Sequence, residues 1–333
     1  MRYVRIAELR PSIGSENNGD HIIQHYISRI MEELFPDRMA IAFPTRSWLS
    51  DENMANLARS EYAFVCGTNL LTSHMEKKPR QWCLNPLNVK NMNAVLLGVG
   101  WWQYQEEPDL YTKWLLKNAL HNDILHSVRD SYTEKKLRSI GITNVLNTAC
   151  PTMWNLTEEH CAKIPHEKAK TVVTTLTNYN KNMDKDAQLL QCLRESYETV
   201  YVWLQAIEDY DYLKDLNWLD KVSVIPPILS EYEKILCTDV DYVGTRLHGG
   251  IHALNYGKRS LILAVDNRAK EIAKDTNLPV VDREIEMDQL QGYIERERET
   301  YIMLPEKSIL EWMKQFKNSR GGVTPLVDAA HGR

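Results

Sequence analysis

Arg246 and His248 lie in the part of the sequence that is richest in chemically useful side chains, residues 243–254. A strand-like run there leads into small residues and then a helical segment, so both side chains fall at the turn. An anion at this turn would meet a bidentate guanidinium, an imidazole that can give a proton, and the free N–H groups of a helix N-terminus. The segment therefore predicts a phosphate or carboxylate site. The alternative is an ion pair between Arg246 and a structural carboxylate, with His248 as a turn residue. His252 is expected in the core.

Arg129 has the same position at the end of another strand-like run, residues 124–128. Asp130 or Ser131 is expected to cap the helix that follows, with Glu134 placed to close a capping box. Arg129 and Asp130 could simply neutralise each other. One such arginine in each half of the chain favours a cleft shared by two domains.

Two polar loops follow other predicted strands. Residues 15–21 contain Asn18, Gly19 and Asp20 and join the first strand to the first helix, where parallel sheets bind ligands. Asp20 could equally be the N-cap of that helix. The loop at residues 66–74 ends in His74, which could donate a proton or contact a phosphate, although a lone loop histidine is usually only solvent-exposed.

Short apolar runs alternate along the chain with segments whose apolar residues recur at helical spacing. This pattern indicates α/β domains with parallel sheets, whose strands and helices would position these side chains. Six strand-like runs are expected in each half of the chain. They are residues 3–9, 39–43, 62–66, 94–98, 124–128 and 144–148, then 171–176, 200–204, 222–225, 242–245, 261–265 and 279–281. Such an architecture binds its ligand at the carboxyl ends of both sets of strands.

The polar stretch at residues 157–170 separates the two sets of strands. We therefore predict an N-terminal Rossmann-like domain at residues 1–165, a C-terminal one at 166–318, and a flexible tail at 319–333. An amphipathic helix around residues 310–316 could cross back onto the first domain.

Composition excludes several classes of protein. A net charge of −5 over 333 residues disfavours nucleic acid as a partner. We see neither an apolar run of about 18 residues nor a secretory signal, so a cytoplasmic protein without a transmembrane segment is expected. The six cysteines form no CxxC pair, which favours reduced thiols over disulfides or a metal site.

Three motifs occur in a characteristic order. They are Asn-Gly-Asp at residues 18–20, Ser-Val-Arg-Asp at 127–130 and Gly-Thr-Arg-Leu-His-Gly at 244–249. This combination resembles the polysaccharide pyruvyl transferase family from about residue 18 to residue 273, including the charged segment at 266–269.

The resemblance implies two Rossmann-like domains that face each other across a cleft, as in the glycosyltransferase-B arrangement. It also implies transfer of a carboxyethylidene group from phosphoenolpyruvate to two hydroxyls of a sugar, in the synthesis of a capsule, exopolysaccharide or cell-wall polysaccharide. Arg129 and Arg246 would hold the donor, His248 would contact its phosphate or protonate it, and His74 is a further catalytic candidate. The donor-binding set implied is Arg129, Arg246, Leu247, His248 and Gly249, with Asn18, Gly19 and Asp20 on the acceptor side.

No cofactor or metal is expected, because arginines and a helix N-terminus can stabilise the departing phosphate. The acceptor is a saccharide. If it is lipid-linked, the protein would contact the inner face of a membrane transiently.

Two alternatives stay open. A glycosyltransferase that uses a nucleotide sugar would share the two-domain arrangement, but no aromatic residue that could stack on a base lies beside Asp266 or Glu271 in the sequence. A non-catalytic sugar-binding protein could use its tryptophans. Most tryptophans, including Trp114 and Trp203, are expected to be packed in the interior.

Overall fold

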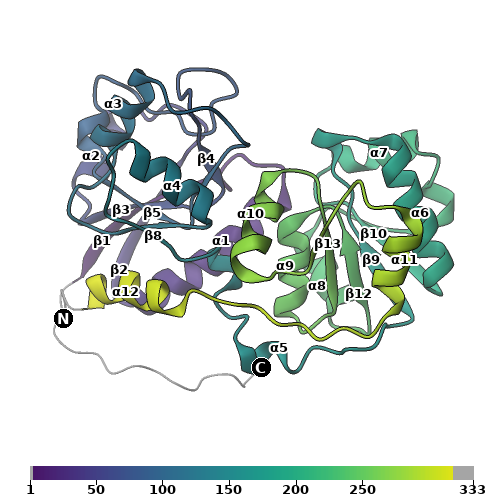
Figure 1. The fold of residues 1–333 in the computed structure, drawn as a ribbon. Helices are drawn as coiled ribbons and strands as arrows, with labels where there is room; N and C mark the ends of the chain where they lie inside the picture. Colours follow the sequence, from purple (N-terminus) through teal and green to yellow (C-terminus); the bar gives the residue numbers. More distant parts are fainter. Residues whose placement is uncertain (1–2, 318–333) are drawn as a thin grey trace.

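The computed structural model describes residues 3–317, which form two α/β domains side by side (Figure 1). The first domain is built on a parallel sheet of order β2-β1-β3-β5. Its elements are β1 (Val4–Arg10), α1 (Asn18–Leu34), β2 (Arg38–Pro44), α2 (Asp51–Ala58), β3 (Tyr62–Cys66) and β5 (Ala94–Leu97).

Two short parallel strand pairs complete the first domain, β4 with β6 and β7 with β8. The elements here are β4 (Asn69–Leu71), β6 (Gly100–Trp101), α3 (Leu110–Ala119), β7 (His126–Val128), α4 (Ser131–Ser139) and β8 (Val145–Asn147). All six strands expected in this half are present. The expectation missed β4 and β6, which are too short to carry a periodic signal.

The second domain has one six-stranded parallel sheet of order β11-β10-β9-β12-β13-β14. Its strands are β9 (Thr171–Thr174), β10 (Thr199–Trp203), β11 (Ser223–Ile225), β12 (Asp241–Gly244), β13 (Ser260–Ala264) and β14 (Val280–Asp282), which confirms the six expected strands. Its helices are α6 (Met183–Ser196), α7 (Glu208–Asp215), α8 (Leu229–Leu236), α9 (Leu247–Asn255), α10 (Asn267–Thr276) and α11 (Met287–Glu295). The strand order reverses between β9 and β12, which opens a crevice at their carboxyl ends.

The helix α9 lies very close to this sheet. A Cβ atom at Gly250 would come within 2.4 Å of Cγ1 of Ile262 on β13, so only glycine allows the approach. The N-terminus of α9, where Arg246 and His248 lie, is therefore held firmly at the crevice.

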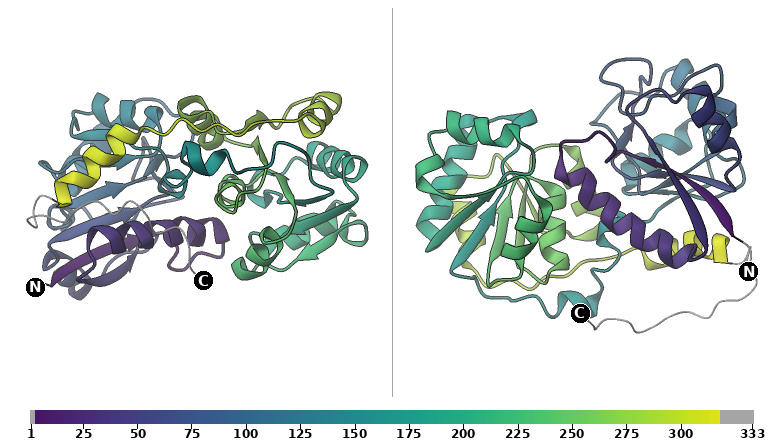
Figure 2. Two further views of the ribbon diagram at one scale, coloured as in Figure 1. Left: turned by 90° about the horizontal axis from the view of Figure 1, so that it is seen from below. Right: turned by 180° about the vertical axis from the view of Figure 1, so that it is seen from behind.

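The helix α1 belongs to the cores of both domains. Ile23 and Ile27 pack with the first sheet, whereas Ile22 and Tyr26 pack in a cluster with residues of the second domain. The 3.6-residue period explains this division, since the two pairs lie on different faces of the helix. Figure 2 shows α1 reaching from the first sheet to α9.

After the second domain, the chain returns to the first as α12 (Glu306–Lys317). Trp312 and Phe316 are buried there against Phe64, at ring-centroid distances of 6.1 and 5.3 Å. Figure 2 shows this helix in yellow beside the first domain. The short helix α5 (Glu158–Cys161) lies on the earlier connection between the domains. The predicted tail at 319–333 lies outside the described residues.

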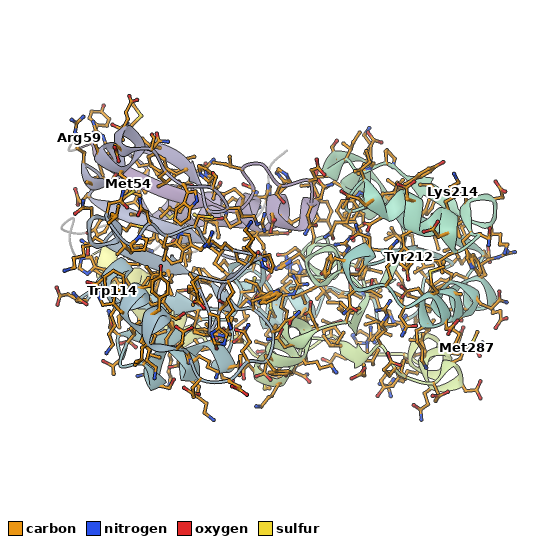
Figure 3. The ribbon with its side chains drawn as sticks, turned by 90° about the horizontal axis from the view of Figure 1, so that it is seen from above. Met54, Arg59, Trp114, Tyr212, Lys214 and Met287 are labelled. Atoms are coloured by element: carbon orange, nitrogen blue, oxygen red, sulfur yellow. The ribbon has the colours of Figure 1, made fainter. Side chains whose placement is uncertain are left out.

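The tryptophans divide into two groups. Trp82, Trp101 and Trp203 are buried, as expected. Trp114 is 42% exposed at the outer edge of the first domain (Figure 3), so the expectation for this residue was wrong. It lies on the outward face of α3, whose Leu115 and Leu116 fill the core instead.

Within residues 3–317, the structure contains no helix long and apolar enough to cross a membrane.

Candidate functional site

Arg129 follows β7 and is completely buried. Its Nη2 donates to Oδ1 of Asn69, and its Nε lies 3.4 Å from Oδ2 of Asp130. Its Nη1 has no hydrogen-bond partner among the described residues. The guanidinium lies against Gly100, where a Cβ atom would come within 2.3 Å of Nε.

The carboxylate of Asp130 faces Arg129 with one oxygen and caps a helix with the other. Its Oδ1 accepts a hydrogen bond of 2.7 Å from the backbone N–H of Thr133, which confirms Asp130 as the N-cap of α4. The expected capping box does not form, since Glu134 instead binds Arg138 one turn later. Arg129 is therefore a buried cation with an unfilled donor position.

His248 lies in the first turn of α9 and is almost completely buried. Burial lowers the pKa of its imidazole well below 6.5, and the nearby guanidiniums of Arg129 and Arg268 lower it further. Its Nε2 lies 3.8 Å from Sγ of Cys150, at the end of the first domain. In this state the imidazole is neutral at physiological pH, and a bound anion would be needed to raise its pKa.

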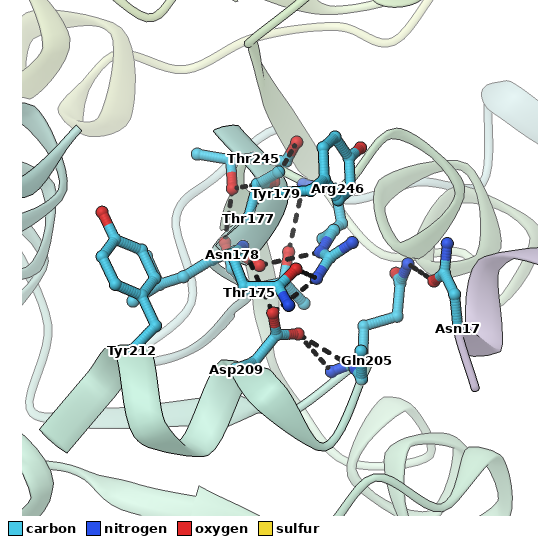
Figure 4. A network of polar contacts seen from close by, with 12 residues as sticks. Asn17, Thr175, Thr177, Asn178, Tyr179, Gln205, Asp209, Tyr212, Thr245 and Arg246 are labelled. Carbon is cyan, nitrogen blue, oxygen red and sulfur yellow. Dashed lines mark hydrogen bonds and ion pairs between the residues drawn. The ribbon is translucent and has the colours of Figure 1, made fainter. Parts of the chain in front are cut away.

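Arg246 has a buried carboxylate partner, one of the two arrangements that the sequence left open. Its Nη2 lies 2.5 Å from Oδ1 of Asp209 and donates to Asn178, and its Nε donates to the carbonyl of Leu176 at 2.8 Å (Figure 4). Its guanidinium carbon lies 4.9 Å from the ring centroid of Tyr179.

A cleft of about 510 Å³ lies between the two domains. Two ion pairs face it, one from each domain: Arg46 with Asp20 at 2.9 Å and Arg268 with Asp266 at 2.5 Å. Its lining comprises Asn17, Asp20, Arg46, Thr68, Asn69, Gln81, Trp102, Gln103, Tyr179, Asn180, Asp266, Asn267 and Arg268.

The cleft and the buried Arg129 are neighbours, because Asn69 lines the cleft and accepts the hydrogen bond from Arg129. Asp266 and Arg268 influence the pKa of His248. Arg129, His248, Arg268 and Asp266 thus form one charged cluster at the inner end of the cleft.

Residues 18–20, expected in a loop, form the first turn of α1, and they contact the second domain as well as the cleft. Asn18 donates to the backbone carbonyls of Gln205 and Pro227 in the second domain, at 3.0 and 3.1 Å. Gly19 packs against the side chain of Gln205. Asn17, not Asp20, is the N-cap of α1, so that expectation for Asp20 was wrong.

Asp20 lies in the first turn of α1, where both carboxylate oxygens are occupied. Its Oδ1 accepts from Thr68, and its Oδ2 accepts from Ser15 and Arg46. These contacts hold the carboxylate at the cleft wall.

The structure does not bring His74 to the cleft. Its Nδ1 lies 2.7 Å from Oδ2 of Asp109, the N-cap of α3, and 3.9 Å from Oε1 of Glu76. The three ligand atoms lie within 4.8 Å of one another, a spacing that could hold a metal ion. All three side chains are partly exposed.

The other residues of α9 named from the sequence have contacts inside the protein. His252 is buried, with its Nδ1 2.9 Å from the hydroxyl of Tyr26, which confirms its expected place in the core. Leu247 packs in the apolar cluster of the second domain. The carbonyl of Gly249 accepts a hydrogen bond from Tyr232.

Among the cleft residues that sequence reasoning missed, Arg46 and Tyr179 bear most on the chemistry. Arg46 follows β2 at its carboxyl end, so the rule that found Arg129 could have found it. Tyr179 provides an aromatic ring beside Asp266 and Arg268, 5.6 Å from the guanidinium carbon of Arg268, which corrects the expectation that none was near. No local signal links these residues, because they are far apart in the sequence.

A model of the polysaccharide pyruvyl transferase family matches residues 17–267, well over half of the chain. The chain belongs to this family. The match contains all three motifs at residues 18–20, 127–130 and 244–249. No curated protein matches the chain.

Solved structures show which fold this member of the polysaccharide pyruvyl transferase family has. The UDP-GlcNAc 2-epimerase of Methanocaldococcus jannaschii is similar with a TM-score of 0.55 and 11% identity, over 96% of this chain and 100% of that chain. A structure of S. aureus MnaA with UDP gives a TM-score of 0.53 and 11% identity, over 96% and 97% of the two chains.

At this identity the likeness shows the fold alone, and it confirms the two-domain glycosyltransferase-B-like architecture. As a member of the polysaccharide pyruvyl transferase family, the protein is a transferase of polysaccharide biosynthesis.

Proposed function

We propose that the protein transfers a carboxyethylidene group from phosphoenolpyruvate to two hydroxyls of a sugar in cell-surface polysaccharide synthesis. The observation that carries this proposal is the buried guanidinium of Arg129, whose Nη1 has no partner among the described residues. A buried donor nitrogen without a partner is costly, and Asp130 occupies only the Nε side of the guanidinium, so an anionic ligand at Nη1 is expected.

Phosphoenolpyruvate suits the cluster at the inner end of the cleft. It carries a phosphate and a carboxylate on a short rigid frame, and guanidiniums donate charge-assisted hydrogen bonds to both groups. We assign the two anionic groups to Arg129 and Arg268, with His248 between the domains as their neighbour. The Nε and Nη2 atoms of Arg129, Arg246 and Arg268 all have acceptors, so each of these arginines offers the donor its Nη1.

His248 has the role of proton donor in this scheme. Binding of the donor's negative charge raises the pKa of its imidazole, which then protonates the methylene carbon of phosphoenolpyruvate. One sugar hydroxyl adds to the neighbouring carbon and loses its proton, and phosphate leaves. The second hydroxyl then closes the ketal and loses its own proton. The scheme uses no metal or cofactor, so a chelator should leave turnover unchanged.

A glycosyltransferase that uses a nucleotide sugar is the second candidate, because Tyr179 supplies an aromatic ring beside Asp266 on which a base could stack. The two functions differ in donor. In either case the site would work in the cytoplasm, or at the inner membrane face if the acceptor is lipid-linked.

The test is the melting temperature of the protein with phosphoenolpyruvate and, separately, with a panel of nucleotide sugars. A ligand at about 100 times its Kd adds roughly 2.7 kcal/mol of stability. We expect phosphoenolpyruvate to raise the melting temperature of the wild type and of Arg138→Met, a matched change on exposed α4, but not of Arg129→Met. A shift only with a nucleotide sugar would support the second candidate. No shift with phosphoenolpyruvate contradicts the first.

A further inference from the structure

The ionisable side chains that line the cleft balance one another. Of the thirteen lining residues, two are arginines and two are aspartates, and each arginine contacts the aspartate of its own domain. Although burial opposes ionisation, the Arg268 guanidinium lowers the pKa of Asp266 below its usual value, so this pair is ionised at neutral pH. The lining has no net charge.

The remaining lining suits hydroxyl groups. Six amide side chains face the cleft, and each offers both donors and acceptors. Two aromatic residues, Trp102 and Tyr179, offer ring faces on which the apolar face of a pyranose could pack. Small-molecule pockets are usually mostly apolar, whereas eleven of the thirteen residues that line this one are polar or charged. A volume of about 510 Å³ is enough for a small saccharide.

On the first-domain side of the cleft, the Asp20 carboxylate that neutralises Arg46 is held firmly in place. Asp20 is only 5% exposed and is fixed by Ser15, Thr68 and Arg46. Thr68, at the cleft wall, has a φ of +57°, which a β-branched residue rarely adopts. Backbone outliers of this kind cluster at ligand sites.

From these observations we infer that the cleft binds an uncharged sugar and discriminates against both acidic and basic ones. A uronic acid would bring its carboxylate to Arg46, which Asp20 already neutralises, and would lose its hydration without gaining an unpaired cation, since Arg268 is assigned to the donor. Arg129, whose Nη1 has no partner among the described residues, lies behind Asn69 and would be left to the donor. The inference rests on the proposed function in treating this sugar as the acceptor and in assigning Arg268 to the donor.

The test is binding of the full chain to an array of neutral, uronic-acid-containing and unacetylated amino-sugar glycans, with and without phosphoenolpyruvate. The wild type should bind neutral glycans. Asp20→Asn leaves Arg46 uncompensated, so affinity for uronic-acid glycans should rise about tenfold, equivalent to about 1.4 kcal/mol. Arg46→Gln leaves Asp20 uncompensated and should produce the same gain for cationic amino sugars.

The matched controls are Glu159→Gln and Lys163→Gln, which make the same changes in net charge at an exposed ion pair on the connection between the domains. Neither should alter glycan preference. The inference is overturned if the wild type prefers acidic or basic glycans, if it binds no glycan, or if neither cleft variant shifts the preference. Two opposite variants keep the test informative even if one does not fold.

The outcome is separable from that of the proposed function. Stabilisation by phosphoenolpyruvate together with binding of acidic glycans alone would overturn the neutral cleft and leave the donor assignment intact. Binding of neutral glycans without any effect of phosphoenolpyruvate would overturn the donor assignment and leave the neutral cleft intact.

Discussion

The carboxylate of Asp275, on α10 of the second domain, accepts hydrogen bonds from the backbone N–H and the hydroxyl of Ser131 in the first domain, at 2.6 and 2.8 Å. The amide of Asn147 adds a third hydrogen bond at 2.9 Å. Because Ser131 is two residues after Arg129, and α10 also carries Arg268, this contact fixes the two guanidiniums relative to each other.

Asp275→Ala should therefore weaken phosphoenolpyruvate binding about tenfold, since Arg268 would no longer be held opposite Arg129. Isothermal titration calorimetry measures the change. Asp282→Ala, which removes the exposed partner of Lys270 on the same helix and a hydrogen bond from the backbone N–H of Glu284, is the control and should leave the affinity unchanged. Equal affinities for the wild type and Asp275→Ala would show that the interdomain contact does not position the donor site.

Arg246→Met should cost about 3–5 kcal/mol of unfolding free energy, because it leaves the buried carboxylate of Asp209 without its partner. Arg246 thus supports the fold whether or not it also contacts the donor. Urea denaturation gives the measurement. The double variant with Asp209→Asn should recover part of the loss, and a single variant as stable as the wild type would contradict this account of the pair.

Gly100→Ala should abolish donor binding without changing any charge, because the new methyl group would collide with the guanidinium of Arg129. Thermal stabilisation by phosphoenolpyruvate is the observable. The control is Gly292→Ala on α11, where a Cβ atom meets nothing within 4 Å and the helix should gain up to about 1 kcal/mol. Normal donor binding by Gly100→Ala would place the donor elsewhere.

Stability should decrease as the pH falls below about 6.5. Burial lowers the pKa of His126 to about 4 and that of His252 to about 3, whereas unfolded imidazoles titrate near 6.5. Between these values the unfolded chain binds protons that the folded chain does not. The unfolding free energy then falls by about 1.4 kcal/mol per pH unit for each histidine. Chemical denaturation at pH 7.5, 6.5 and 5.5 tests this. In His252→Gln, the dependence of the unfolding free energy on pH should decrease by the contribution of one histidine.

Much of the fold could be predicted from sequence because buried parallel strands appear as short apolar runs of similar length. Because ligands of parallel sheets bind at the carboxyl ends of the strands, the sequence also indicated Arg129 and Arg246, which lie there. It could not show which carboxylates neutralise these two arginines. Asp209, which neutralises Arg246, is 37 residues away, whereas the adjacent Asp130 both caps a helix and faces Arg129, whose Nη1 has no partner among the described residues.

Most of the cleft lining could not be predicted either, because its residues meet only through tertiary contacts. Tyr179 meets Arg268 only because β9 and β13 lie in one sheet, with β12 between them. The protonation state of His248 depends on burial between two domains, which local sequence does not encode. Residue types at strand ends indicate where chemistry can occur, but the tertiary contacts decide which groups are free to act.

The return of α12 to the first domain has a consequence for synthesis on the ribosome. Phe35 and Phe64, in the first domain, pack against Phe316, which is translated only after the entire second domain. The first domain must therefore wait with part of its apolar surface uncovered while the second one emerges, a state that is prone to aggregation. A chain that stops before α12 would keep that surface exposed permanently, even though every strand of both sheets is present.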